Sequence, residues 1–95
     1  MKDIREAAVE RRLVDAVREL GGVAFKFVSP GNDGVPDRLV LLPGGRIYFV
    51  EVKREGWKLR PNQRLQVKRI EELGFPVFRC EGFDGVQAFL GIIRV

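Results

Sequence analysis

The sequence predicts an α/β fold in which a mixed four-stranded sheet is flanked by helices. Segments with helical apolar periodicity and short β-branched or aromatic segments follow one another in the order α-β-β-β-α-β-α. The three consecutive strands favour a meander. The helix before the fourth strand lets that strand run parallel to a neighbour through a right-handed crossover. With 95 residues and no long polar linker, the chain is expected to form one domain, residues 1–95.

The first part of the chain supplies a helix and a strand. The helix is predicted from about Asp3 to Leu20, where Gly21-Gly22 ends it. Val23–Val28 is predicted as a strand, and residues 29–34 form a loop rich in turn-forming residues. The helix is predicted from one apolar face with helical spacing, formed by Val9, Leu13, Ala16, Val17 and Leu20.

The rest of the chain begins with a hairpin. Pro43-Gly44-Gly45 is a turn signal between two strand segments, because tight turns favour glycine. Pro61 suits the first turn of a helix, where a missing N–H costs nothing, and Gly74 ends that helix. These signals predict strands at Asp37–Leu42, Arg46–Lys53 and Pro76–Cys80, and helices at Pro61–Leu73 and Val86–Ile93.

The composition restricts the chemistry of the chain. It has no histidine, which excludes serine–histidine and cysteine–histidine catalysis and histidine-ligated zinc. Hydrolysis would have to use carboxylates, lysine and a hard metal ion bound through oxygen. The one cysteine, Cys80, lies in an apolar segment and is interpreted as a buried, inert thiol. No apolar run could cross a bilayer, and the charged first residues are unlike a secretory signal, so a cytoplasmic location without membrane contact is expected.

Basic residues are concentrated in one part of the chain. Residues 53–69 contain seven basic residues and one acid, whereas the rest contains ten basic and twelve acidic residues. Such a tract on a nearly neutral body suggests an anionic partner, most commonly nucleic acid. From charge alone, a solvated helix face is an equally good interpretation.

Two carboxylates and a lysine are predicted to meet at the open end of the hairpin. If Gly44-Gly45 is the centre of the turn, Asp37 lies opposite Val52, with a register error of one residue left open. Glu51 and Lys53 point to the same face because side chains alternate along a strand. Two neighbouring acids repel each other unless a cation intervenes, and a divalent metal ion would activate water there. The alternative is a solvated cross-strand salt bridge.

The motifs around these residues resemble one nuclease family. GGVAFKFVSPGNDGVPDRLVLLPGGRIYFVEVK, followed by LRPNQ, is similar to stand-alone, phage-type members of the VRR-NUC family in the PD-(D/E)XK superfamily. The resemblance covers roughly residues 10–78. It implies a restriction-endonuclease-like core, in which Lys53 is catalytic and Gln63, rather than Gln66, belongs to the site. The implied metal ligands are Asp37, Glu51, the carbonyl of Val52, and Glu10, with Glu6 as the alternative.

The resemblance also implies a function. It predicts a metal-dependent endodeoxyribonuclease using Mg²⁺ or Mn²⁺, which acts as a homodimer on branched DNA in the manner of a Holliday-junction resolvase. The alternatives are a non-catalytic nucleic-acid-binding module and a small-molecule phosphoesterase. Trp57 either stacks on a base or, as we favour from sequence, anchors its loop. The predicted phosphate contacts are Lys26, Arg38, Lys58, Arg60, Arg64 and Lys68.

Overall fold

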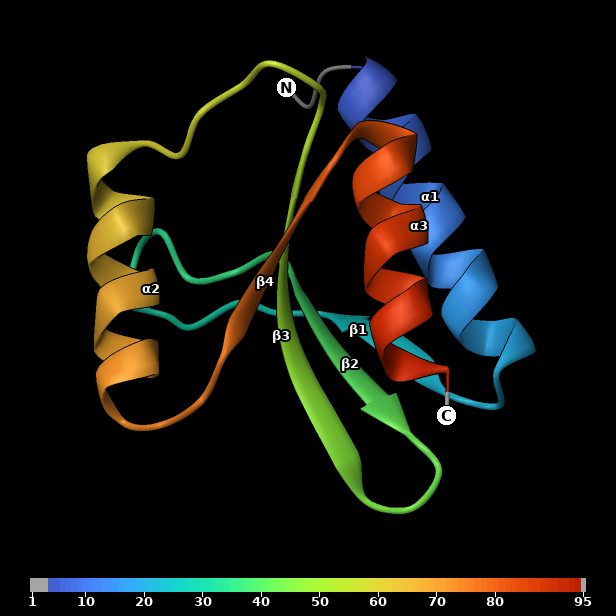
Figure 1. Ribbon diagram of the computed structural model, residues 1–95. Helices are drawn as coiled ribbons and strands as arrows, with labels where there is room; N and C mark the ends of the chain where they lie inside the picture. Colours follow the sequence, from blue (N-terminus) through green and yellow to red (C-terminus); the bar gives the residue numbers. More distant parts are fainter. Residues whose placement is uncertain (1–3, 95) are drawn as a thin grey trace.

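The computed structural model of the protein describes residues 4–94 and has the predicted order of elements. A four-stranded sheet lies between two layers of helices, with α1 and α3 on one face and α2 on the other (Figure 1). No helix within residues 4–94 is both long and apolar enough to span a membrane. The elements are α1 (Ile4–Glu19), β1 (Val23–Lys26), β2 (Arg38–Leu42), β3 (Arg46–Lys53), α2 (Pro61–Glu72), β4 (Val77–Glu81) and α3 (Gly82–Ile93).

The sheet has the strand order β1-β2-β3-β4. The first three strands form the predicted antiparallel meander, and β4 lies parallel to β3 after the connection through α2. The register of the hairpin differs by one residue from the prediction, because Leu42 pairs with Arg46 and the turn is centred on Gly44. Pro43 belongs to this turn, which therefore has three residues rather than two. Extending the pairing places Asp37 level with Glu51 instead of Val52.

The apolar core lies between the sheet and the pair α1 and α3. The predicted apolar face of α1 is buried, except that Leu20 is only partly so. It packs with the alternate strand residues Val40, Val50 and Val52, each fully buried. Cys80 is also fully buried, and burial raises the pKa of its thiol to about 12. This thiol is therefore inert, as predicted.

The last helix begins four residues earlier than predicted, at Gly82 instead of Val86. Gly82 and Gly85 resemble loop residues in the sequence, but Gly85 is helical and serves close packing. A Cβ at Gly85 would lie 2.9 Å from the backbone carbonyl carbon of Cys80. The absence of a side chain thus lets α3 lie directly against β4.

The opposite face of the sheet is covered less completely. The strand contacts of α2 are mainly with β4, so the end of this face near the hairpin turn is left partly exposed. Val23, Phe25 and Ile47 on this face are 40%, 54% and 48% exposed. One face of the sheet therefore carries the core, and the other combines a polar end with an exposed apolar end.

Candidate active site

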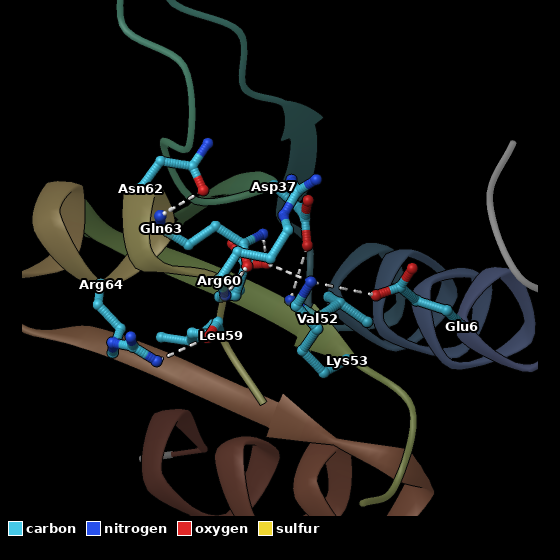
Figure 2. Close-up of polar contacts among 10 residues, drawn as sticks. Glu6, Asp37, Val52, Lys53, Leu59, Arg60, Asn62, Gln63 and Arg64 are labelled. Carbon is cyan, nitrogen blue, oxygen red and sulfur yellow. Dashed lines mark hydrogen bonds and ion pairs between the residues drawn. The ribbon is translucent and has the colours of Figure 1, made fainter. Parts of the chain in front are cut away.

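Asp37 lies at the polar end of this second face, directly before β2. Its Oδ2 accepts a hydrogen bond from the backbone N–H of Val52 at 2.9 Å. Figure 2 shows Asp37, Lys53 and Gln63 converging from the start of β2, the end of β3 and the start of α2. The bond to Val52 ties the carboxylate to the neighbouring strand and holds it beside Glu51.

Glu51 is the centre of the cluster and is only 1% exposed. Its Oε2 accepts a hydrogen bond from Nε2 of Gln63 at 3.0 Å and lies 3.6 Å from Nζ of Lys53. Its Oε1 is buried without a hydrogen-bond partner among the described residues. Burial, and secondly the negative charge of Asp37, raise the pKa of Glu51 to about 8, against the opposing effect of Lys53.

Lys53 joins the strand carboxylate to the first helix. Its Nζ is 3.6 Å from Glu51 and 3.8 Å from Oε1 of Glu6, and its side chain is 12% exposed. Figure 2 shows Glu6 reaching toward Lys53 from α1. Glu10 instead forms an ion pair with Arg38 at 3.2 Å. Of the two helix carboxylates considered, Glu6 is therefore the one in contact with Lys53.

Gln63 is held in one orientation by two hydrogen bonds. Its Oε1 accepts from the backbone N–H of Arg60 at 2.8 Å, so its amide nitrogen is directed toward Glu51. The bond to Arg60 forms because Gln63 is the third residue of α2 and reaches back to the residue before the helix. Gln66 donates instead to the carbonyl of Asp33, at 3.4 Å. The preference for Gln63 over Gln66 agrees with these contacts.

The loop before Asp37 is attached to the start of α2. Asn62 donates to Oδ2 of Asp33 at 2.7 Å. Gly34 has a φ of +95°, and a Cβ there would lie 2.7 Å from the carbonyl of Asn62 and 2.9 Å from the backbone nitrogen of Gln63. Only glycine allows this approach. The loop and the helix therefore place Asp37 and Gln63 together.

Comparison with known proteins identifies the family. The VRR-NUC domain model matches residues 3–84. The chain belongs to the VRR-NUC domain family. It is 50% identical over 84 residues to "Putative nuclease p44" of Acyrthosiphon pisum secondary endosymbiont phage 1, a match covering 88% of this chain and 90% of that protein. A solved structure described as "VRR_NUC domain" superimposes with a TM-score of 0.86 at 32% identity, covering 98% of this chain and all of the other.

The carboxylates of this VRR-NUC domain suit a divalent metal ion. Half-buried Asp37 lies beside buried Glu51, and the Oε1 atom of Glu51 is buried without a partner among residues 4–94. A hard cation would satisfy that oxygen and remove the repulsion that raises the pKa of Glu51. Within residues 4–94, no three acidic, cysteine or histidine side chains form a cluster that could hold a metal ion. The protein would thus supply two carboxylates and complete the coordination with other oxygen atoms.

The predicted phosphate contacts of the VRR-NUC domain separate into two groups. Lys26 of β1 lies opposite Arg38 of β2 in the strand register. Both side chains point to the face opposite Asp37, because neighbouring residues of a strand alternate. The guanidinium of Arg38 donates to the carbonyl of Ala24 at 3.1 Å and pairs with Glu10, so its predicted contact with phosphate is not supported by this geometry.

The other four basic residues are all exposed; Lys58, Arg60 and Arg64 lie around the start of α2, and Lys68 lies farther along the helix. Arg60 lines a small pocket, of about 220 Å³, together with Asp37 and Gln63. Lys58 and Arg64 line a second pocket, in which Arg79 of β4 joins them. Arg79 is absent from the sequence prediction. It lies beside Glu51 only through the parallel register of β3 and β4.

Proposed function

We propose that this VRR-NUC domain is a metal-dependent endonuclease that hydrolyses phosphodiester bonds of DNA. The main support is Glu51, held between Asp37, Lys53 and Gln63, with one carboxylate oxygen that has no partner in the described part of the chain. A structural salt bridge would not need a second carboxylate beside it, and its oxygens would be satisfied. The family relationship and the nuclease name of the phage protein support the same reaction.

Each residue has a role that its contacts suggest. Asp37, Glu51 and the carbonyl of Val52 would hold Mg²⁺ or Mn²⁺, and Glu6 of α1 contacts this group through Lys53. An ion bound at these oxygens would supply Lewis-acid polarisation of a phosphoryl oxygen and an acidic water molecule. Lys53, 3.6 Å from Glu51, would orient the attacking water and offset the negative charge that develops on the phosphate. Gln63 keeps Glu51 in position through its amide.

Incubation with DNA tests the activity directly. The purified protein is mixed with linear, flapped and four-way-junction DNA in Mg²⁺, Mn²⁺ or EDTA, and the products are separated on gels. We expect cleavage with either metal and none with EDTA. Lys53→Ala should abolish turnover while calorimetry still detects metal binding, because the ammonium acts on water and phosphate. DNA binding without cleavage in every metal would support the non-catalytic module instead.

We also propose that the protein works as a homodimer on branched DNA. Val23, Phe25 and Ile47 form an exposed apolar face on strands β1 and β3. The residues of β2 that pair with them on this face, Leu39 and Leu41, are also apolar. A second copy is a self-complementary occupant of this face, and two sites allow both strands of a junction to be cut.

Sedimentation analysis with a matched pair of variants tests the dimer. Phe25 and Phe83 are both 54% exposed, but Phe83 lies in α3 on the other side of the sheet. Phe25→Lys should shift the protein to a monomer, and Phe83→Lys should not. Phe25→Lys should also lose paired cleavage of four-way junctions. If the wild-type protein sediments as a monomer at all concentrations, the homodimer proposal is wrong.

A further inference from the structure

A second pocket lies beside the candidate active site and has no role in the reaction described so far. It has a volume of about 450 Å³ and lies between residues 56–59, the first turns of α2, and β4. Its lining includes Trp57 and the cations Lys58, Arg64 and Arg79. The volume is within the range of about 300–1,000 Å³ in which proteins bind small ligands. An aromatic ring with three cations suits a ligand that has both an aromatic and an anionic part.

Trp57 is not the anchor of its loop. Its side chain is 51% exposed, whereas Leu59, two residues later, is 7% exposed and fastens the loop to the body of the protein. The guanidinium of Arg54 lies 4.5 Å from the centre of the tryptophan ring and covers one of its faces. The ring is therefore oriented by a cation–π contact and still half open to solvent. This arrangement favours the stacking interpretation over the loop anchor that we favoured from sequence.

The charges of the pocket suit one phosphate group. One guanidinium nitrogen of Arg64 donates to the carbonyl of Leu59 at 3.0 Å. This bond orients the side chain, and its other N–H groups can donate to a phosphate. Arg79 lies 4.0 Å from Glu81, the one acid in the pocket wall. Three cations and one acid give the pocket a net positive charge. Contacts between such cations and a phosphate would position the DNA without reading its sequence.

The register of β3 and β4 places this pocket next to the catalytic carboxylate. Glu51 pairs with Arg79, and Lys53 pairs with Glu81. Neighbouring strands are ~4.7–4.9 Å apart, and paired residues point to the same face. Arg79 therefore lies on the active-site face, on the strand next to Glu51. A DNA strand held at Glu51 thus brings its adjacent nucleotides to the pocket.

We propose that this pocket binds one unpaired nucleotide of the DNA substrate, with its base stacked on Trp57 and its phosphate facing Lys58, Arg64 and Arg79. A base inside a duplex is stacked on both faces, so only an unpaired or extruded base can reach the ring. The pocket therefore selects DNA with an unpaired nucleotide near the cleaved bond. This inference rests on the proposed nuclease function and adds the feature by which the substrate is chosen.

Trp57 is the only tryptophan in the sequence, so its fluorescence reports on the pocket directly. The wild-type protein is titrated in EDTA with four ligands: a flapped duplex, the same duplex with abasic flap nucleotides, a fully paired duplex, and dAMP. We expect quenching by the flapped duplex at concentrations where the abasic and paired forms produce none. dAMP should quench only weakly and at much higher concentration, because the pocket is proposed to bind a nucleotide that belongs to a DNA strand. Equal quenching by flapped and abasic DNA, or stronger binding of dAMP than of any DNA, would overturn the proposal.

Variants separate this pocket from the chemistry. Trp57→Leu should lower the preference for flapped over paired DNA by about 5- to 150-fold, measured by anisotropy of labelled DNA, which is the stacking contribution of one base. Trp57→Phe should retain part of it. Arg79→Gln should weaken binding of flapped DNA more than Arg69→Gln, which neutralises an arginine of α2 outside the pocket wall. An unchanged preference in Trp57→Leu would refute the pocket. These binding measurements need no cleavage, so failure of the nuclease proposal is detected separately.

Discussion

One face of the sheet carries the apolar core and the other carries the candidate active site, and strand β3 contributes alternate residues to each. Val50 and Val52 point to the core between the sheet and the pair α1 and α3, where both are fully buried. Glu51 and Lys53 point to the other face, where burial raises the pKa of Glu51 to about 8. Burial stabilises the fold on the first face and destabilises the charged form of a carboxylate on the second. Residues that stabilise the core and residues of the candidate active site therefore alternate along β3.

Removing a carboxylate from the second face should have the largest effect on activity. Asp37→Asn and Glu51→Gln should each lower the cleavage rate at least about 100-fold, because metal activation supplies several kcal/mol of the barrier reduction. DNA binding should persist or improve, since each change removes a negative charge. Single-turnover cleavage and anisotropy measure the two effects. Asp15→Asn, an exposed change on α1, is the control, and near-normal cleavage by either site variant would refute the assignment.

A cavity in the first face should affect stability and leave the chemistry intact. Leu13 of α1 is fully buried in the core. Leu13→Ala should lower the free energy of unfolding by about 2–5 kcal/mol. Urea denaturation measures this loss. The cleavage rate per folded molecule should stay close to that of the wild type, and a parallel loss of both would show that the two faces are not independent.

The contact between the loop at Gly34 and α2 should affect both the stability of the protein and the arrangement of side chains on the second face. Gly34→Ala introduces a Cβ that meets the backbone of Asn62, at a φ that L side chains rarely adopt. We expect a loss of about 1–3 kcal/mol in unfolding free energy. The cleavage rate should fall as well, because the displaced helix no longer holds Gln63 against Glu51. Gly31→Ala is the matched control, since its φ is also positive and nothing lies near its Cβ.

The buried carboxylate should make the metal-free protein less stable as the pH rises. The pKa of Glu51 is about 8 in the folded protein, against an ordinary value of 4.5. Between these values the unfolded chain loses the proton while the folded protein keeps it, so stability falls as the pH rises through this window. Glu51→Gln should therefore be more stable than the wild type in EDTA, by a margin that grows from pH 5 to pH 8. Urea denaturation at several pH values measures the margin, and Glu71→Gln, an exposed change on α2, should show no such growth.

The smallest expected effect concerns the exposed cations near the second face. Lys58→Gln combined with Lys68→Gln should lower the slope of log affinity against log salt by roughly 0.7–0.9 for each lost phosphate contact. The cleavage rate at saturating DNA should change little, because neither side chain contacts the carboxylates. A salt titration in Ca²⁺ measures the slope without cleavage. An unchanged slope would indicate that this tract is only a solvated helix face.

The sequence by itself determined the elements and the central residues of the site. Turn signals and periodicity predicted all seven elements, because they depend on local conformational preferences and on burial of one face. The pairing of Asp37 with Glu51 and Lys53 followed from the hairpin, with an error of one residue in its register. Even this error left the cluster intact, since Glu51 and Lys53 share one face in either register.

Only the tertiary structure decided features that depend on how distant elements are positioned. Glu6 and Glu10 are one helical turn apart on α1, so the choice between them depends on how far the helix is shifted along the sheet. Arg79 reaches the site through the register of two strands that are separated by a helix. The early start of α3 depends on the contact of Gly85 with β4, and the exposure of Trp57 depends on Leu59 anchoring the loop in its place. Local preferences contain no information on such long-range distances, because these are set by packing of the whole domain.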